Sequence, residues 1–203
     1  MARRKTLSDT DLLKAAREVF VQKGLAAPTR AIAQHAGVSE GVLFQRFPTK
    51  TELFFAAMVP PPAALPEPPA GPLPEAECEA ALRQIAQNLL DYFRIAAPIL
   101  LPLSTHPDFR FEEFAARHPQ SSLAGMRSSL VRFFAVNKAP DPSGASLLLM
   151  SSMHGIAMFE RLGAYGGRFP AEFVDRALGC LCQAVRPASD HAKLAPIEER
   201  GKA

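Results

Sequence analysis

The side chains best suited to recognition chemistry lie between Thr29 and Lys50, in a segment whose order of residues is typical of two short helices joined by a tight turn. In the major groove of DNA, an arginine can bond guanine and a glutamine can bond adenine through two hydrogen bonds each. We therefore expect Arg30, Val42 and Gln45 to contact bases, with Val42 touching a thymine methyl group. Lys50 opens a helix, where its charge and the neighbouring backbone N–H groups can meet a phosphate.

Other residues of the same segment complete the candidate DNA interface. We expect Thr29 and Ser39 to contact the DNA backbone. Leu43 is expected to face inward, which leaves the side chains on the opposite side of its helix able to contact the groove. The candidate DNA-binding set is Thr29, Arg30, Ser39, Glu40, Gly41, Val42, Phe44, Gln45, Arg46 and Lys50.

Two short helices must position these side chains. Ile32, Ala33 and Ala36 recur at helical spacing and form the inner face of the first helix. Gly37 can take a left-handed backbone and end that helix, and Ser39 is a good N-cap for the next one. This order predicts a helix-turn-helix, in which the second helix can enter the major groove. A small helical bundle without a DNA role is the alternative.

Flanking signals add a helix on each side of this pair. Pro48 stops the second helix, and Thr49–Glu52 has the Thr and Glu of a capping box that starts another helix. Upstream, Ser8 caps a helix that ends at Gly24. Residues 1–58 are therefore expected to form a compact four-helix head.

The order of residues in this head resembles the tetracycline-repressor (TetR) family of one-component bacterial regulators. That family typically shows Ile-Ala, then Ala-Gly-Val-Ser, then Gly-Thr-Leu-Tyr, then Phe-Pro-Ser-Lys followed by Glu and Leu. The matching residues here are Ile32-Ala33, Ala36-Gly37-Val38-Ser39, Gly41-Val42-Leu43-Phe44, and Phe47-Pro48-Thr49-Lys50 with Leu53. The resemblance covers about the first quarter of the chain.

Three positions depart from the family pattern. Phe44 stands where a Tyr is usual and lacks the hydroxyl that often reaches a phosphate, and Val42 replaces a common Thr. Pro28 stands where a Ser or Thr usually caps the helix, and it offers neither a capping oxygen nor an N–H. These departures change the expected DNA contacts and leave the expected fold intact.

The resemblance implies an all-α regulator with a C-terminal helical domain for ligand binding and dimerisation. It implies a homodimer on a pseudo-palindromic double-stranded operator, most simply a repressor released by a small-molecule effector. Aromatic and methionine side chains of this domain favour an apolar effector, with His154 as a polar anchor or as a hydrogen-bonded core or interface residue. The candidate ligand-binding residues are Leu89, Phe93, Phe111, Phe114, Met126, Phe133, Met150 and His154.

The charge of the chain is unevenly distributed. The formal net charge is +3, yet residues 1–50 carry nine Lys and Arg against four Asp and Glu. A basic head suits a surface that faces phosphates, although a solvated N-terminus would have the same composition. The sequence has no secretory signal and no apolar run of the roughly 20 residues that span a bilayer, so we expect a cytoplasmic protein without a membrane partner.

No set of residues suggests catalysis, since nucleophile motifs, phosphate-binding glycine loops and metal-ligand spacings are all missing. We expect no enzyme activity, no cofactor and no metal. Cys78, Cys180 and Cys182 form no disulfide framework, and buried thiols are favoured over a redox sensor. Two alternatives stay open: an all-α ligand-binding or enzymatic protein with a structural helix-turn-helix, and a ligand-blind regulator or activator.

Downstream of the head, the sequence predicts a linker, a helical body and a tail. Residues 60–74 contain eight prolines and cannot be helical, so 59–74 is expected to be a linker or loop, with a partner motif as the alternative. Residues 75–187 show helical periodicity, with Pro98 and Pro102 expected to kink or end one helix. Residues 188–203 are expected to be a disordered tail.

The last two predicted helices carry more apolar residues than one buried face needs. The first is expected to run from an Asp141-Pro142 start to a break at Gly166-Gly167, and the second from near Pro170 to Pro187. A helix that is apolar all round needs neighbours on every side. We expect a second subunit to cover part of these helices, with a fully internal core helix as the alternative.

Overall fold

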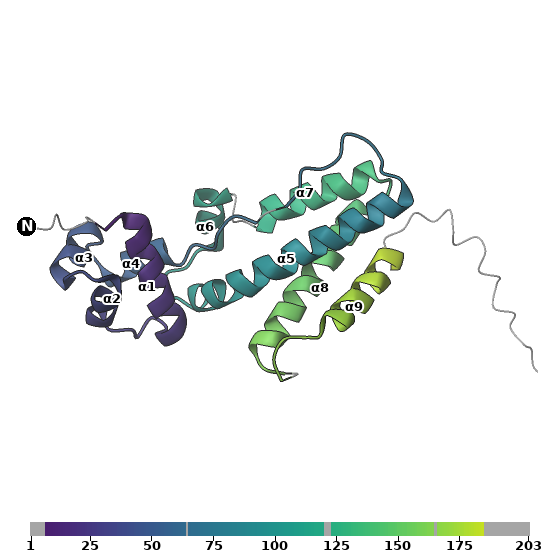
Figure 1. The fold of residues 1–203 in the computed structure, drawn as a ribbon. Helices are drawn as coiled ribbons and strands as arrows, with labels where there is room; N and C mark the ends of the chain where they lie inside the picture. Colours follow the sequence, from purple (N-terminus) through teal and green to yellow (C-terminus); the bar gives the residue numbers. More distant parts are fainter. Residues whose placement is uncertain (1–6, 64, 120–122, 165, 185–203) are drawn as a thin grey trace, which may run out of the picture. The chain divides into compact units, whose positions relative to one another are not determined.

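The computed structural model describes residues 7–63, 65–119, 123–164 and 166–184 of the chain (Figure 1). Every regular element in these ranges is a helix, which confirms the all-α prediction. The predicted tail at 188–203 and the predicted stop at Pro187 lie outside the described residues. The helices are α1 (Asp9–Lys23), α2 (Thr29–Ala36), α3 (Glu40–Arg46), α4 (Lys50–Ala57), α5 (Glu75–Ser104), α6 (Phe111–Arg117), α7 (Leu123–Val136), α8 (Pro142–Arg161) and α9 (Ala171–Ala184).

The chain divides into two compact units. Unit 1 comprises Met1–Ala64 and Asp91–Gly125, and unit 2 comprises Leu65–Leu90 and Met126–Ala203. The long helix α5 therefore contributes its first half to unit 2 and its second half to unit 1. The predicted head of residues 1–58 lies within unit 1, which also contains α6.

One apolar core joins the helices of unit 1. Phe20 of α1, Ile32 of α2, Leu43 of α3 and Phe54 of α4 are fully buried, together with Leu103 near the end of α5. The rings of Phe20 and Phe54 pack edge to face with centroids 5.1 Å apart. Burial of this kind fixes the positions of the short helices, which are too short to be stable alone.

The predicted helix starts are confirmed by capping hydrogen bonds. The backbone N–H of Val42 donates to Ser39 Oγ over 3.3 Å, and that of Glu52 donates to Thr49 Oγ1 over 3.1 Å. Ser8 caps α1 in the same way, and Asp141 caps α8 with Pro142 as its first helical residue. These caps satisfy N–H groups that have no partner inside the helix.

Helix α5 does not end at Pro98, one of the two prolines that were expected to kink or end it. The helix continues through Pro98 and stops only at Ser104, two residues after Pro102. A proline removes one intrahelical hydrogen bond, and the buried side chains of Ile99 and Leu103 hold this part of the helix in the core of unit 1. The Ser104 hydroxyl donates to the carbonyl oxygen of Leu101 over 2.9 Å and helps to close the helix end.

Unit 2 contains the first half of α5 together with α7, α8 and α9 (Figure 1). The predicted break at Gly166-Gly167 is wrong, because α8 ends at Arg161. Gly163 takes a positive φ of 68°, and the N–H of Ala164 donates back to the carbonyl oxygen of Phe159 over 3.2 Å. That geometry satisfies the last turn of the helix before the two later glycines are reached.

Between Ala57 and Glu75 the described residues form no helix, as their prolines predict. The N–H of Leu73 donates to Asn137 Oδ1 over 2.9 Å, which fastens the end of this segment to the residue that follows α7.

The preference for buried thiols is wrong for Cys180, which is exposed on the single chain. No helix among the described residues is both long and apolar enough to cross a membrane.

Candidate nucleic-acid interface

The turn between α2 and α3 has the geometry that the sequence predicts. Gly37 adopts a left-handed conformation, with φ 69° and ψ 28°, which a glycine reaches without a steric cost. The N–H of Val38 donates to the carbonyl oxygen of Ala33 over 3.0 Å and closes the end of α2. Ser39 then starts α3, and Leu43 turns its fully buried side chain into the head. The turn thus holds one face of α3 inward and leaves the other outward.

The outward face of α3 carries the predicted base-contacting residues. Gly41, Phe44 and Gln45 are exposed, with 39% of Phe44 accessible, and Val42 is partly buried. At the start of α2, Arg30 is also exposed. Helix α3 thus exposes the amide of Gln45 beside small and apolar groups, and the start of α2 exposes the guanidinium of Arg30. Side chains of these types can contact base edges in a major groove.

Two predicted DNA-binding residues bond each other. Thr29 Oγ1 donates to Glu40 Oε1 over 2.6 Å, and both side chains are partly buried. The bond joins the first residue of α2 to the first residue of α3. It also gives the Glu40 carboxylate a partner inside the protein, on a helix that is expected to approach phosphates.

Arg46, another predicted DNA-binding residue, is held at the opposite end of α3. Its Nη1 donates to the carbonyl oxygen of Leu7 over 2.7 Å and to Asp9 Oδ1 over 3.0 Å. The side chain is 23% exposed, so much of the guanidinium is covered by the head. Arg46 therefore fastens the end of α3 to the start of α1.

Lys50 is the first residue of α4 and is partly buried. Thr49 Oγ1 caps this helix at the N–H of Glu52, while the earlier N–H groups of the first turn have no partner within the helix. A lysine beside such N–H groups is suited to hold a phosphate.

Several groups that support the head were not predicted from the sequence. Arg17 Nε donates to the carbonyl oxygen of Ala57 over 2.7 Å, and partial burial lowers the pKa of this arginine. Glu18 Oε2 lies 2.7 Å from His35 Nε2, a hydrogen bond that lowers the pKa of the carboxyl group. These partners are separated by 40 and 17 residues, so no local pattern could have revealed them.

His106 is a further supporting group without a sequence signal. It is 8% exposed, and its ring stacks on Phe54 with centroids 5.6 Å apart. The N–H of Asp108 donates to His106 Nδ1 over 3.1 Å, which assigns the ring proton to Nε2. The residue thus joins the end of α5 to α4 within unit 1.

The predicted ligand-binding residues lie in both units. Leu89, Met126, Phe133 and Met150 are buried in unit 2, where His154 is exposed. The other three belong to unit 1: Phe93 is buried, Phe114 is partly buried, and Phe111 is 48% exposed. Within the described ranges, no three His, Cys, Asp or Glu side chains come together in a way that could hold a metal ion.

Solved structures of bacterial regulators share this fold. A TetR transcriptional regulator from Agrobacterium tumefaciens aligns with a TM-score of 0.62 and 16% identity, over 91% of this chain and 97% of that one. A transcriptional regulator from Rhodococcus sp. Rha1 aligns with a TM-score of 0.59 and 23% identity, over 88% and 95%. A TetR family regulator from Pseudomonas syringae pv. tomato gives a TM-score of 0.59 and 18% identity, over 88% and 96%.

The fold and the capped α2–α3 pair define a helix-turn-helix protein. Residues 12–57 match the family model described as bacterial regulatory proteins, tetR family. This match begins within α1, runs to the end of α4 and includes every part of the turn described above. Over residues 12–57 the chain therefore matches the tetR family of bacterial regulatory proteins, as the motifs of this segment indicate.

Proposed function

We propose that the protein is a homodimeric transcriptional repressor that binds a pseudo-palindromic operator and leaves it when a small, mainly apolar molecule binds. The observation that supports DNA recognition best is the exposed face of α3, fastened at both ends to the head. A recognition helix must be rigid to place hydrogen-bonding groups on base edges. The basic balance of residues 1–50 supports the same surface.

Helix α8 supports the homodimer. On one side it buries Leu149, Met153 and Ile156, while the opposite side exposes large apolar groups. These are Leu147 (60% exposed), Leu148 (43%), Phe159 (49%) and, one residue after the helix, Leu162 (68%). They recur at positions i, i+1, i+12 and i+15, which lie on one side of a helix. Within the part of the chain that the structure describes, this stripe is open, which favours cover by a second subunit over a fully internal α8.

Helix α9 extends the apolar surface. Phe173 is 40% exposed, and Ala177 and Leu181 follow at helical spacing with partial exposure. Stripes on two neighbouring helices suit a two-fold interface of four helices. Such a dimer would present two heads to operator half-sites about 34–36 Å apart.

The proposal that an effector releases the protein from DNA is supported by the apolar character of the predicted ligand-binding residues. An effector can lower operator affinity only if it binds the DNA-free conformation more tightly than the DNA-bound one. Leu89, Met126, Phe133 and Met150 are buried apolar groups that suit an apolar molecule.

Fluorescence anisotropy with labelled DNA tests the function. We expect the full chain to bind a fragment from upstream of its own gene at least ~1,000-fold more tightly than random DNA of equal length at physiological salt. Equal affinity for both DNAs across several candidate fragments would contradict specific regulation. Turnover of any bound small molecule would favour an enzymatic role instead.

A further inference from the structure

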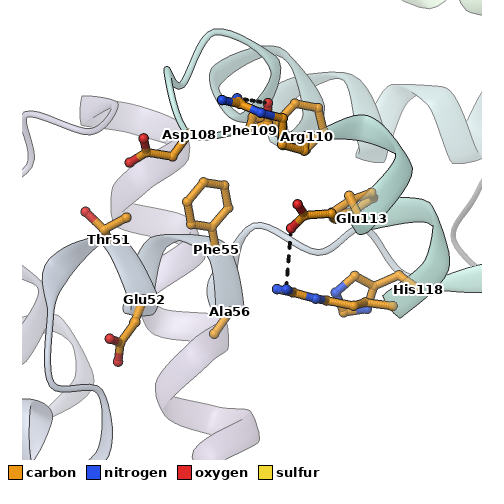
Figure 2. Close-up of a pocket in the computed structure, with 11 residues that line it drawn as sticks. Thr51, Glu52, Phe55, Ala56, Asp108, Phe109, Arg110, Glu113 and His118 are labelled. Atoms are coloured by element: carbon orange, nitrogen blue, oxygen red, sulfur yellow. Dashed lines mark hydrogen bonds and ion pairs between the residues drawn. The ribbon is translucent and has the colours of Figure 1, made fainter.

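Unit 1 contains a pocket of about 360 Å³ beside α4 (Figure 2). Residues of α4 line one wall, and residues of α6 and of its connection to α5 line the other. The lining residues are Thr51, Glu52, Phe55, Ala56, Asp108, Phe109, Arg110, Glu113, Phe114, Arg117 and His118. Of the ligand-binding residues predicted from the sequence, Phe114 belongs to this set. Small-molecule sites typically have volumes of about 300–1,000 Å³, so this pocket suits a small ligand.

The lining separates into charged and uncharged residues by exposure. The charged residues are all exposed and carry both signs: Glu52, Asp108, Arg110, Glu113 and Arg117. The side chains of Asp108 and Arg117 are 73% and 74% exposed, and water and salt screen charges at such positions. These groups therefore select neither a cation nor an anion.

The other lining residues form the inner surface of the pocket. All of them are partly buried: Thr51, Phe55, Ala56, Phe109, Phe114 and His118. Burial, followed by the charge of Arg117, lowers the pKa of His118, so this ring is neutral at neutral pH. The surface that a bound molecule would contact is thus mainly apolar and aromatic, and it carries no net charge.

The aromatic rings of the lining belong to two groups, one on each wall. On α4, the Phe55 ring contacts the His106 ring edge to face, with centroids 4.8 Å apart. On the opposite wall, the Phe114 ring contacts those of Phe109 and His118, with centroids 5.7 and 5.0 Å apart. Figure 2 shows Phe55 projecting from α4 toward that wall. These contacts hold the rings of each wall in place, and the pocket lies between the two groups.

We propose that this pocket binds a small, neutral aromatic molecule whose ring inserts between Phe55 and Phe114. Aromatic pairs favour edge-to-face or offset arrangements with centroids about 4.5–7 Å apart, which adds to the gain from burial. A saturated molecule of the same shape would gain burial alone. A charged substituent would find only solvated charges of both signs at the rim.

This site goes beyond the effector proposed above. It lies in unit 1, whereas the buried residues that support that effector lie in unit 2. The inserted ring would contact α4 and α6 together, so binding should stabilise unit 1 against unfolding.

A titration of the full chain with matched probes tests the site. The neutral pair is 2-naphthalenemethanol and its saturated counterpart, decahydronaphthalene-2-methanol, and the charged pair is 2-naphthoate and 2-naphthylmethylammonium. Amide chemical shifts of the ¹⁵N-labelled protein report both affinity and position. We expect 2-naphthalenemethanol to bind roughly fivefold more tightly than the saturated probe, with shifts at 51–56 and 106–118. Neither charged probe should bind more tightly than the neutral aromatic one.

Variants that replace one ring by an apolar side chain sharpen the test. Phe114→Leu and Phe55→Leu alter opposite walls, and each should weaken 2-naphthalenemethanol roughly fivefold while the saturated probe stays within about twofold. Phe111→Leu is the matched control, because Phe111 is 48% exposed on α6 and lies outside the lining. It should leave both affinities unchanged. Circular dichroism checks that each variant folds, and the two pocket variants provide independent tests.

Several results would overturn the site. These are equal binding of the two neutral probes by the wild type, tighter binding of either charged probe, shifts confined to unit 2, and an unchanged aromatic preference in both folded pocket variants. The titration contains no DNA, so it remains decisive even if the protein proves not to be a repressor.

Discussion

Ala177→Glu is the sharpest test of the proposed dimer. Ala177 is partly exposed on the single chain, on the same side of α9 as Phe173 and Leu181. A glutamate there can reach water in the monomer, so the fold of one chain should be preserved. In the proposed dimer the same carboxylate would be buried against the apolar stripe of the partner subunit, without a cation to pair with it.

The size of the effect follows from desolvation. An unpaired buried charge costs about 3 kcal/mol or more, and a two-fold interface contains two copies of it. A total of about 6 kcal/mol corresponds to a dimer dissociation constant roughly four orders of magnitude weaker. A dimer with nanomolar affinity would therefore become largely monomeric at micromolar concentration. Operator binding should fall with it, because one head alone contacts one half-site.

Sedimentation velocity over a wide concentration range measures this change. Ala171→Glu is the matched control, since it places the same side chain on an exposed position of α9 away from the stripe. Circular dichroism should show equal helicity for both variants. A wild-type dissociation constant for Ala177→Glu would place the interface elsewhere.

Four further substitutions test the DNA and effector proposals. Lys50→Ala should weaken operator and random DNA alike and lower the salt slope by about one unit, which a salt titration measures. Gln45→Ala should cost about 1–3 kcal/mol and relax one symmetric pair of operator positions, so an unchanged consensus in a randomised-site selection would exclude base contact. Thr29→Val should free the Glu40 carboxylate and weaken DNA binding, and adding Glu40→Gln should restore it in an anisotropy assay. Phe93→Leu should weaken both the thermal stabilisation and the DNA release produced by an apolar effector, whereas loss of only one would separate the two effects.

Local signals explain why the head could be predicted from the sequence. Ser39 and Thr49 each find their bonding partner three residues away, and Gly37 ends its helix by its own backbone freedom. Spacings of this kind are visible in one short segment of sequence. The helix-turn-helix therefore follows from the sequence almost residue by residue.

Errors arose where distant packing or a competing local signal determined the result. Pro98 was expected to kink or end α5, and the helix does not end there, because buried neighbours of that proline belong to the core of unit 1. Gly163 ended α8 before the more conspicuous Gly166-Gly167 pair because it was the first glycine able to take a positive φ after the helix. The pocket between α4 and α6 combines segments about 50 residues apart, so no sequence pattern could have indicated it.

The distinction between local and distant partners also changes the interpretation of the candidate DNA surface. Arg46 and Glu40 have residue types that suit DNA contact, and the sequence cannot show that each already has a partner. In the structure, Glu40 bonds Thr29 at the start of α3, and Arg46 bonds Leu7 and Asp9 at its end. Because both ends of α3 are fastened to the head, its exposed side chains have a defined direction before DNA binds. Less conformational entropy is therefore lost when they bind the DNA. Specificity is thus expected to depend on two groups of residues, one that contacts the bases and one that holds the helix in place.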